Sequence, residues 1–226
     1  MSERQVGEGV ESMNVRMVWI TPDAEQTIGY CARVTSPQNQ GKDAARLLRY
    51  CIRHGHWSPF EMASMCVEIE TTRAISAQIL RHRSFSFQEF SQRYSPVQTP
   101  PEVPEMRLAG ATNRQSSIKA ELGMETICTV QRATTLMRLL WIEYRKLIEQ
   151  GVAPECARAF LPLCTPTRLY MAGTIRSWLH YTDLRKSSDT QEEHRQIAEN
   201  IDALLRDNLP NVMAAMDERK KETDDR

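Results

Sequence analysis

The chain has 226 residues and a mass of 26.0 kDa, of which 41% are hydrophobic and 26% charged. This composition is that of an ordinary globular protein, and it excludes a disordered polymer, a collagen-like repeat and a small disulfide-stabilised protein. Lysine plus arginine and aspartate plus glutamate each number 29, so the net charge is zero and no overall field attracts a polyanion such as duplex DNA. Any anion that the protein binds must be held by local groups.

The first dozen residues carry charges and lack an apolar stretch, and no uncharged run is long enough to cross a bilayer. We expect a soluble, cytoplasmic protein with no membrane contact. Six cysteines are scattered along the chain without a CxxC pair. In a reducing compartment this spacing favours small buried side chains over a disulfide framework, and we expect no metal site.

In the first third of the chain, the pattern predicts a flexible tail over 1–13, a strand over 15–20 and a short helix from Lys42 that ends at Gly55. Residues 62–71 alternate and predict a half-buried strand. Its core face comprises Ala63, Met65, Val67 and Ile69, and its other face comprises Met62, Ser64, Cys66, Glu68 and Glu70.

The middle of the chain begins with helix-compatible residues at 72–83, and the four prolines of 95–104 predict an irregular connector. A long helix follows and ends at Gly151. Its start near Gln115 is interrupted by Gly123. The apolar stripe of this helix is Val130, Ala133, Met137, Leu140, Trp141, Tyr144, Leu147 and Ile148. The stripe is compatible with a subunit interface and equally with packing inside one chain.

After Pro154 the pattern predicts an apolar strand and then a helix with Ile175, Trp178 and Leu179 on its inner face. The last helix is expected to start at Thr190, which has the spacing of a capping box with Glu193. Few strands and several helices in irregular order favour an α+β fold with a small mixed or antiparallel sheet. We expect a single domain over 14–208 and a charged C-terminal tail over 209–226, in which DERKKETDDR at 217–226 is a solvated charge run.

The segment richest in chemistry is 78–94, where Arg81, His82 and Arg83 are consecutive. Consecutive helical residues point about 100° apart, so these three can contact one ligand only where a helix ends. Arginine forks beside hydroxyl and amide side chains are typical of a site for a phosphorylated small molecule. Two other interpretations remain open: an exposed basic helix end, and a surface that binds single-stranded nucleic acid. The neutral net charge weakens the second.

Arg81-His82-Arg83, followed by seven residues and then Ser91, resembles the RHRx7S signature of the flavin-dependent thymidylate synthases, the ThyX family. Other segments are similar to the family in the same order: CARVTSP at 31–37, HGHWSPFEM at 54–62, ARAFLPL at 157–163 and RSWLHYTDLR at 176–185. The resemblance covers approximately residues 14–205 and leaves only the two tails.

The resemblance implies an enzyme that converts dUMP to dTMP. The carbon comes from 5,10-methylenetetrahydrofolate, and the reducing equivalents come from NADPH through bound FAD. Such an enzyme needs no cysteine nucleophile, and none of the six cysteines lies in the signature. The family also implies a homotetramer in which several subunits build each active site.

Residue roles are carried over from the family. The FAD contacts would be His56, Ser58, Arg81, His82, Arg83, Glu89, Thr174, Ile175, Arg176 and His180. The dUMP contacts would be Gln78, Ile79, Leu80, Arg81, Glu89, Phe90, Ser91, Gln92, Arg93, Arg158 and Arg185. Arg185 would be the catalytic residue, stabilising negative charge that develops on the uracil ring. Alternatively, Arg185 only stabilises a helix C-terminus, and His56 is a loop histidine without a ligand.

The chain departs from the family pattern at two positions, with Thr174 where many relatives have asparagine and Asp189 where many have histidine. Threonine lacks the paired donor and acceptor of an amide, which puts one flavin contact in question. Asp189 is a candidate for a helix N-terminus. The segment 107–117, with Asn113-Arg114-Gln115, is either a loop that closes over a nucleotide or a solvated connector.

Two alternatives to the enzyme remain. One is a flavin or nucleotide binder without catalysis, and the other is a module for RNA or single-stranded DNA. We expect neither nucleic-acid nor membrane partners.

Overall fold

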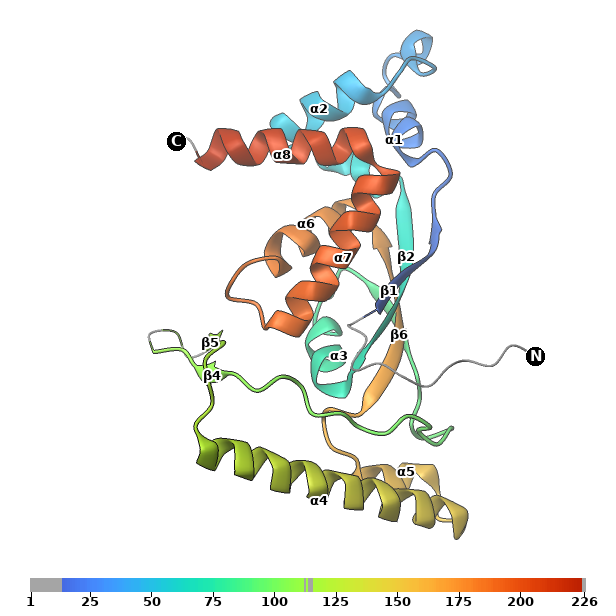
Figure 1. Cartoon of the computed structure of the whole chain (residues 1–226). Coiled ribbons are helices and arrows are strands. Elements are labelled where there is room, and N and C mark those ends of the chain that lie inside the picture. The colour runs from blue at the N-terminus through green and yellow to red at the C-terminus, as the bar shows by residue number, and fades with distance from the viewer. Residues whose placement is uncertain (1–13, 112, 114–115, 225–226) are drawn as a thin grey trace, which may run out of the picture. The chain divides into compact units, whose positions relative to one another are not determined.

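The computed structural model describes residues 14–111, 113 and 116–224, and its α+β class agrees with the prediction (Figure 1). The flexible tail predicted over 1–13 lies outside the described residues. The chain divides into two compact units, neither of which is one continuous stretch. Unit 1 comprises 1–14, 70–81 and 89–169, and unit 2 comprises 15–69, 82–88 and 170–226.

The main sheet has four strands in the order β1-β2-β6-β3. Their bounds are β1 Asn14–Ile20, β2 Ser64–Thr72, β6 Pro166–Thr174 and β3 Ser86–Glu89. The chain passes from one unit to the other within β1, β2, β3 and β6, so the units are not sequential domains. The bounds of β1, β2 and β6 confirm three predicted strands, over 15–20, over 62–71 and after Pro154.

One expectation for β2 was wrong, because the strand is buried on both faces rather than half-buried. Cys66 and Glu68, assigned to the polar face, are only 7% and 6% exposed. Arg16 on β1 donates to Oε1 of Glu68 at 2.9 Å, which compensates for burying the carboxylate. This partner is far away in sequence, so alternation alone could not show it.

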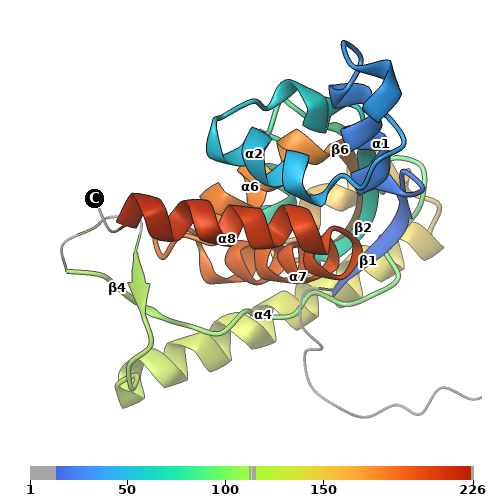
Figure 2. The ribbon, with the colours of Figure 1, turned by 90° about the horizontal axis from the view of Figure 1, so that it is seen from above.

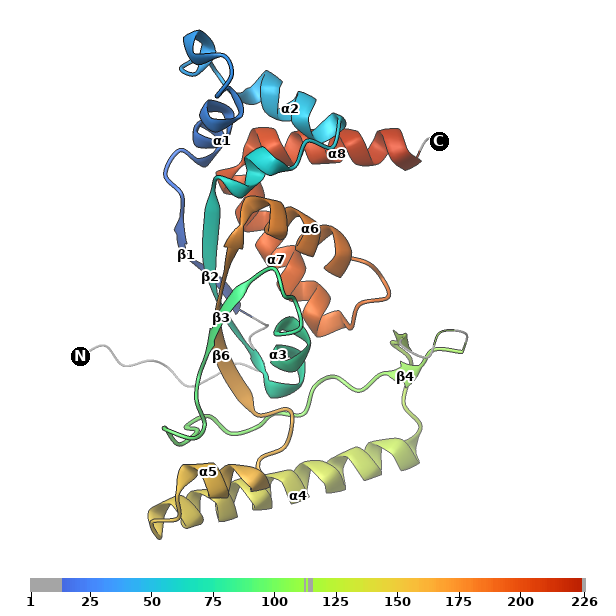
Figure 3. The same ribbon diagram turned by 180° about the vertical axis from the view of Figure 1, so that it is seen from behind.

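Unit 2 contains most of the helices, and α6 packs on α7 while α2 packs on both α1 and α8 (Figure 3). Their bounds are α1 Ala24–Ala32, 3-10 helix η1 Pro37–Asn39, α2 Ala45–Arg53, 3-10 helix η2 Ser58–Glu61, α6 Ile175–Arg185, α7 Glu192–Asn208 and α8 Pro210–Asp224. The expected stop of α2 is confirmed, since Gly55 follows it with φ +70°, a conformation that favours glycine.

The core of unit 2 forms around α6, as its apolar face predicted. Trp178 is fully buried, and its indole Nε1 donates to the carbonyl of Met65 at 3.0 Å. Ile175 is also fully buried, and Leu179 is 2% exposed. Each buried aliphatic side chain of this kind contributes about 1.5–3 kcal/mol relative to exposure, which fixes α6 and the residues at both its ends.

Two expectations for the C-terminal region were wrong. Gln191, not Thr190, is the N-cap of α7, and its Nε2 donates to Oε2 of Glu193 at 2.9 Å. Asp189 lies two residues before this cap. The expected solvated tail is largely a helix, α8, and the apolar residues at its start are buried, with Val212 at 0% and Met213 at 4% exposure.

Unit 1 contains the long helix α4, with α5 beside it (Figure 3). Its elements are α3 Arg73–Ile79, the antiparallel pair β4 Leu108–Ala109 and β5 Ser117–Ile118, α4 Met124–Glu149, α5 Pro154–Ala157 and 3-10 helix η3 Arg158–Phe160. The connector over 95–104 is irregular, as predicted. Arg114 and Gln115 of the proposed closing loop lie outside the described residues.

The helix α4 starts later than expected, because Gly123 is its N-cap and β5 occupies part of the preceding segment. The stop at Gly151 is confirmed by a φ of +85°. Of the predicted stripe only Tyr144 is buried, and its hydroxyl accepts a hydrogen bond from the backbone N–H of Val97 at 2.8 Å. The rest of the stripe is partly or largely exposed.

The expectation that most cysteines are buried was also wrong, since Cys128 and Cys156 are exposed and only Cys51 and Cys66 are buried. Burial raises the pKa of the Cys51 and Cys66 thiols, which keeps them protonated. Within the described part of the chain, no helix is both long and apolar enough to cross a membrane.

Candidate functional site

The signature segment begins where α3 ends, as the sequence required. Gln78 and Ile79 lie in the last turn, Leu80 is the C-cap, and Arg81 follows outside the helix. Gln78 accepts a backbone hydrogen bond from Arg81 at 3.3 Å. The break in the helix removes the constraint that kept the Arg81 and His82 side chains on different faces. Ile79 is fully buried, so its side chain belongs to the core rather than to a ligand surface.

In unit 1 the carboxylate of Glu89 is held by three donors. Its Oε1 accepts from Ser76 Oγ at 2.6 Å and from Thr167 Oγ1 at 3.0 Å, and it pairs with Arg73. No side chain among the described residues donates to Oε2 of Glu89. This carboxylate is therefore oriented by one oxygen and offers the other to a ligand.

Arg93 and Arg158, expected to bind the dUMP phosphate, are both exposed and belong to unit 1. Arg93 Nε lies 3.5 Å from Oε2 of Glu155, three residues before Arg158. An exposed pair of this kind contributes about 0–1 kcal/mol, so a dianionic phosphate can replace the carboxylate at little cost.

Gln92 is 9% exposed, and its side-chain Nε2 is buried without a hydrogen-bond partner among the described residues. Leaving a buried amide donor unpaired costs about 1–3 kcal/mol, and such groups concentrate at functional sites. The neighbouring Ser91 is partly buried. A ligand carbonyl that reached Gln92 would remove this cost.

In unit 2 the candidate catalytic residue Arg185 is oriented by His82. Arg185 Nε donates to Nε2 of His82 at 2.8 Å, so that ring nitrogen carries no proton. Burial, together with the charges of Arg185 and His180, lowers the pKa of His82 to about 4. The hydrogen bond and the lowered pKa both indicate that His82 is a neutral acceptor. His82 therefore orients the guanidinium of Arg185 without neutralising its positive charge.

Two residues behind this pair were missed by the sequence interpretation. Tyr181 is fully buried, and its ring centroid lies 4.9 Å from that of His82. Tyr181 Oη is 3.0 Å from Nε2 of His194, which is also fully buried. Burial, then the charge of Arg185 and the nearby His82, lowers the pKa of His194 to about 3. The only sequence signal for Tyr181 was its place one turn before Arg185.

Unit 2 also contains a pocket of about 650 Å³, within the range of roughly 300–1,000 Å³ that is usual for small-molecule and cofactor sites. The residues of its wall that matter for binding are Trp57, Glu61, Arg176, His180, Met216 and Arg219. Only Arg176 and His180 were predicted. Arg176 pairs with Glu61, and the guanidinium of Arg219 lies 4.8 Å from the centre of the Trp57 ring. The wall thus combines an aromatic face with two guanidinium groups.

The other predicted flavin contacts in unit 2 are less clustered. Thr174 is the N-cap of α6 and its Oγ1 accepts from the backbone N–H of Ser177 at 3.3 Å, so threonine serves this cap without an amide. The backbone N–H of Ile175 donates to Ala63 at 2.9 Å, and its side chain is in the core. His56 and Ser58 are exposed and do not line the pocket. Arg83 is exposed as well.

The sequence is similar to that of proteins of a known family. The model of the family described as thymidylate synthase complementing protein matches residues 16–211. A probable flavin-dependent thymidylate synthase of Paramecium bursaria Chlorella virus 1 is 45% identical over 196 residues, covering 86% of this chain and 91% of that protein. The flavin-dependent thymidylate synthase of Synechocystis is 47% identical over 197 residues, covering 85% and 89%. The chain belongs to the family of flavin-dependent thymidylate synthases.

The fold is also similar to that of a solved protein. A UMP/dUMP methylase, PolB from Streptomyces cacaoi, solved with 5-Br dUMP, superposes with a TM-score of 0.79 and 25% identity, covering 92% of this chain and 95% of that one. The match to the family model ends at residue 211, whereas α8 extends to Asp224. Met216 and Arg219 therefore lie beyond the matched segment, which explains why the family resemblance did not indicate them.

Proposed function

We propose that this chain is a flavin-dependent thymidylate synthase that converts dUMP to dTMP. The carbon comes from 5,10-methylenetetrahydrofolate, and NADPH is the reductant through FAD. The observation that carries the dUMP assignment is the buried and unpaired amide of Gln92, which follows Ser91 at the end of the signature and precedes Arg93. A uracil carbonyl satisfies this donor, while Arg93 and Arg158 supply cations for the phosphate.

The pocket of unit 2 fits the flavin cofactor by its size and its donors. Arg176 and His180, both expected flavin contacts, lie in its wall, and the imidazole of His180 can donate or accept a hydrogen bond. When bound, FAD supplies the hydride chemistry that the side chains of this protein cannot perform. His56, Ser58 and Arg83 remain proposed contacts at the edge of this site.

Arg185 is the residue that we propose acts on the uracil ring. Negative charge develops on that ring as its C5 carbon becomes nucleophilic, and a fixed guanidinium stabilises it. Neutral His82 holds the guanidinium by one nitrogen and leaves the other N–H groups for the substrate. A carboxylate in the place of His82 would hold Arg185 equally well and would cancel the charge that the reaction needs.

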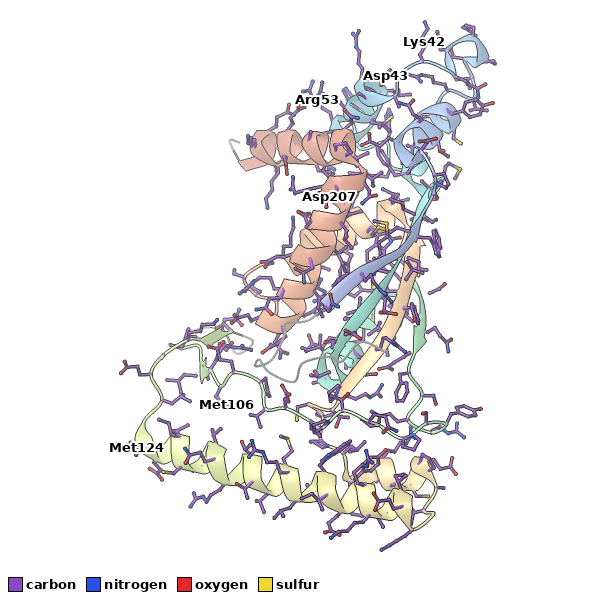
Figure 4. All side chains as sticks on the ribbon, turned by 45° about the vertical axis from the view of Figure 1, so that its right-hand side comes forward. Lys42, Asp43, Arg53, Met106, Met124 and Asp207 are labelled. Atoms are coloured by element: carbon purple, nitrogen blue, oxygen red, sulfur yellow. The ribbon has the colours of Figure 1, made fainter. Side chains whose placement is uncertain are left out.

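We also propose that the enzyme is a homotetramer with α4 at a subunit interface. The middle of α4 presents Leu136, Leu139 and Ile142 to solvent at 62%, 52% and 46% exposure. Figure 4 shows side chains projecting from α4 along its length, starting at the labelled Met124. A second copy of the chain would bury this surface and add walls to the active site. Light scattering that gave an active monomer would contradict this proposal.

The experiment that tests the function measures dTMP formation from dUMP, methylenetetrahydrofolate and NADPH by purified protein stripped of flavin, with and without added FAD. We expect product only with FAD. UMP is assayed in parallel, because the solved relative is a UMP/dUMP methylase. No dTMP in the complete mixture, from protein shown to be folded, would refute the proposed function.

A further inference from the structure

The helix α8 is a fixed part of unit 2, although its sequence is dominated by charge. Three of its acidic residues pair with arginines from other helices: Asp217 with Arg206 at 2.7 Å, Glu218 with Arg49 at 3.0 Å and Glu222 with Arg53 at 3.0 Å. Figure 2 shows α8 beside α2, and Figure 4 shows Arg53 at the end of α2 next to α8. These pairs and the buried Val212 and Met213 hold α8 against the rest of unit 2.

Arg219 differs from these paired carboxylates of α8, because it faces the pocket. It projects into the wall of the pocket, where its guanidinium lies over Trp57 at 4.8 Å. Within the part of the chain that the structure describes, the guanidinium of Arg219 has no carboxylate and no hydrogen-bond acceptor. The aromatic face holds the cation in place and leaves the five N–H donors unused.

The other charged side chains of the pocket do not neutralise Arg219. Arg176 already pairs with Glu61, and Asp183 forms no ion pair with Arg219 in the described residues. Arg219 is therefore a preoriented cation at a pocket wall whose charge is not satisfied by the protein. This arrangement is suited to a phosphate oxygen, because a guanidinium binds phosphate with two parallel hydrogen bonds.

We propose that Arg219, held against Trp57, binds a phosphate group of the flavin dinucleotide. The C-terminal helix thus supplies a cofactor-binding residue from beyond the segment that matches the family. This inference rests on the proposed function, since it places FAD in the pocket of unit 2. Met216, one turn before Arg219 on the same helix, contributes an apolar contact to the same wall.

The test compares Arg219→Ala, Arg219→Lys and Lys220→Ala in the full chain, after flavin removal. Lys220 is the matched control, because it is the next residue on α8, is exposed and removes the same charge. Affinities for FAD and for riboflavin, which has no phosphate, are measured by quenching of flavin fluorescence. Circular dichroism and the midpoint of urea unfolding establish that each variant is folded.

We expect Arg219→Ala to weaken FAD binding about tenfold or more and to change riboflavin binding by less than about twofold. Lysine at this position restores part of the affinity, because it retains the charge without the fork. Lys220→Ala leaves both affinities unchanged. The inference about Arg219 is overturned if wild type and Arg219→Ala bind FAD equally well. It is also overturned if the substitution weakens the binding of FAD and of riboflavin by the same factor. Neither result would overturn the proposed function. Wild-type protein that binds no FAD removes the proposed function and this inference together.

Discussion

His194 makes the stability of the protein depend on pH in a way that can be calculated. It is fully buried against Tyr181, and its pKa falls from 6.5 to about 3 on folding. Its neutral form is therefore favoured in the folded state, and the stability that it contributes is complete above pH 6.5 and is lost as the pH falls from 6.5 towards 3. From pH of about 7.5 to about 5, the loss is about 2 kcal/mol, since each unit below the unfolded-state pKa costs about 1.4 kcal/mol.

The substitution His194→Gln isolates this contribution. Glutamine keeps a polar atom within reach of the Tyr181 hydroxyl and cannot titrate. The free energy of unfolding is measured by urea titration with tryptophan fluorescence, at pH of about 5, 6 and 7.5 and at one protein concentration. Wild type should lose about 2 kcal/mol more than His194→Gln between the extremes. Parallel curves for the two proteins would refute the assignment of a neutral, buried His194.

Three further predictions concern packing, the backbone and catalysis. Tyr144→Phe leaves the buried N–H of Val97 unpaired, so urea unfolding should show a loss of about 1–3 kcal/mol, and an unchanged midpoint would contradict the burial of this bond. Gly151→Ala forces a side chain into φ +85° and should cost about 1–2 kcal/mol in the same assay, whereas Gly41→Ala, which meets no atom within 4 Å, should have little effect. Arg185→Ala should lower kcat for dTMP about 100-fold or more with lysine recovering only part, and full turnover by the alanine variant would exclude the catalytic role.

The sequence predicted best those features that depend on neighbours along the chain. The stop of α2 before Gly55 and of α4 before Gly151 follows from the backbone freedom of glycine, which is a property of one residue. The end of α3 before Arg81 was predicted because the consecutive side chains of 81–83 can contact one ligand only where a helix ends. Both arguments are local and needed no knowledge of the fold.

Two of the failures involve partners that are distant in sequence. Glu68 was placed on an exposed face because its partner, Arg16, comes from another strand. The charge run in α8 was interpreted as a solvated tail because Arg49 and Arg53 lie about 170 residues earlier. Charge patterning shows that a side chain needs a partner or water, and only the fold shows which of them it has.

The same limit applies to the candidate site. The family resemblance identified His82 and Arg185, and the structure joins them by a hydrogen bond. The resemblance did not identify His194, which is fully buried and contacts the hydroxyl of Tyr181. It also could not identify Arg219, which enters the pocket from a helix outside the matched residues.

Several arginines are paired with carboxylates of the protein, whereas others at the candidate site are not. Arg49, Arg53 and Arg206 each pair with carboxylates of α8. Within the described residues, the guanidinium groups of Arg81 and Arg158 in unit 1, and of Arg83, Arg185 and Arg219 in unit 2, form no ion pair. A chain with 29 positive and 29 negative side chains has no net field, yet this uneven pairing leaves positive charge at the signature, at α6 and at the pocket. The nucleotide phosphates are therefore attracted only over short distances, and their binding depends on the geometry of these few side chains rather than on the charge of the whole protein.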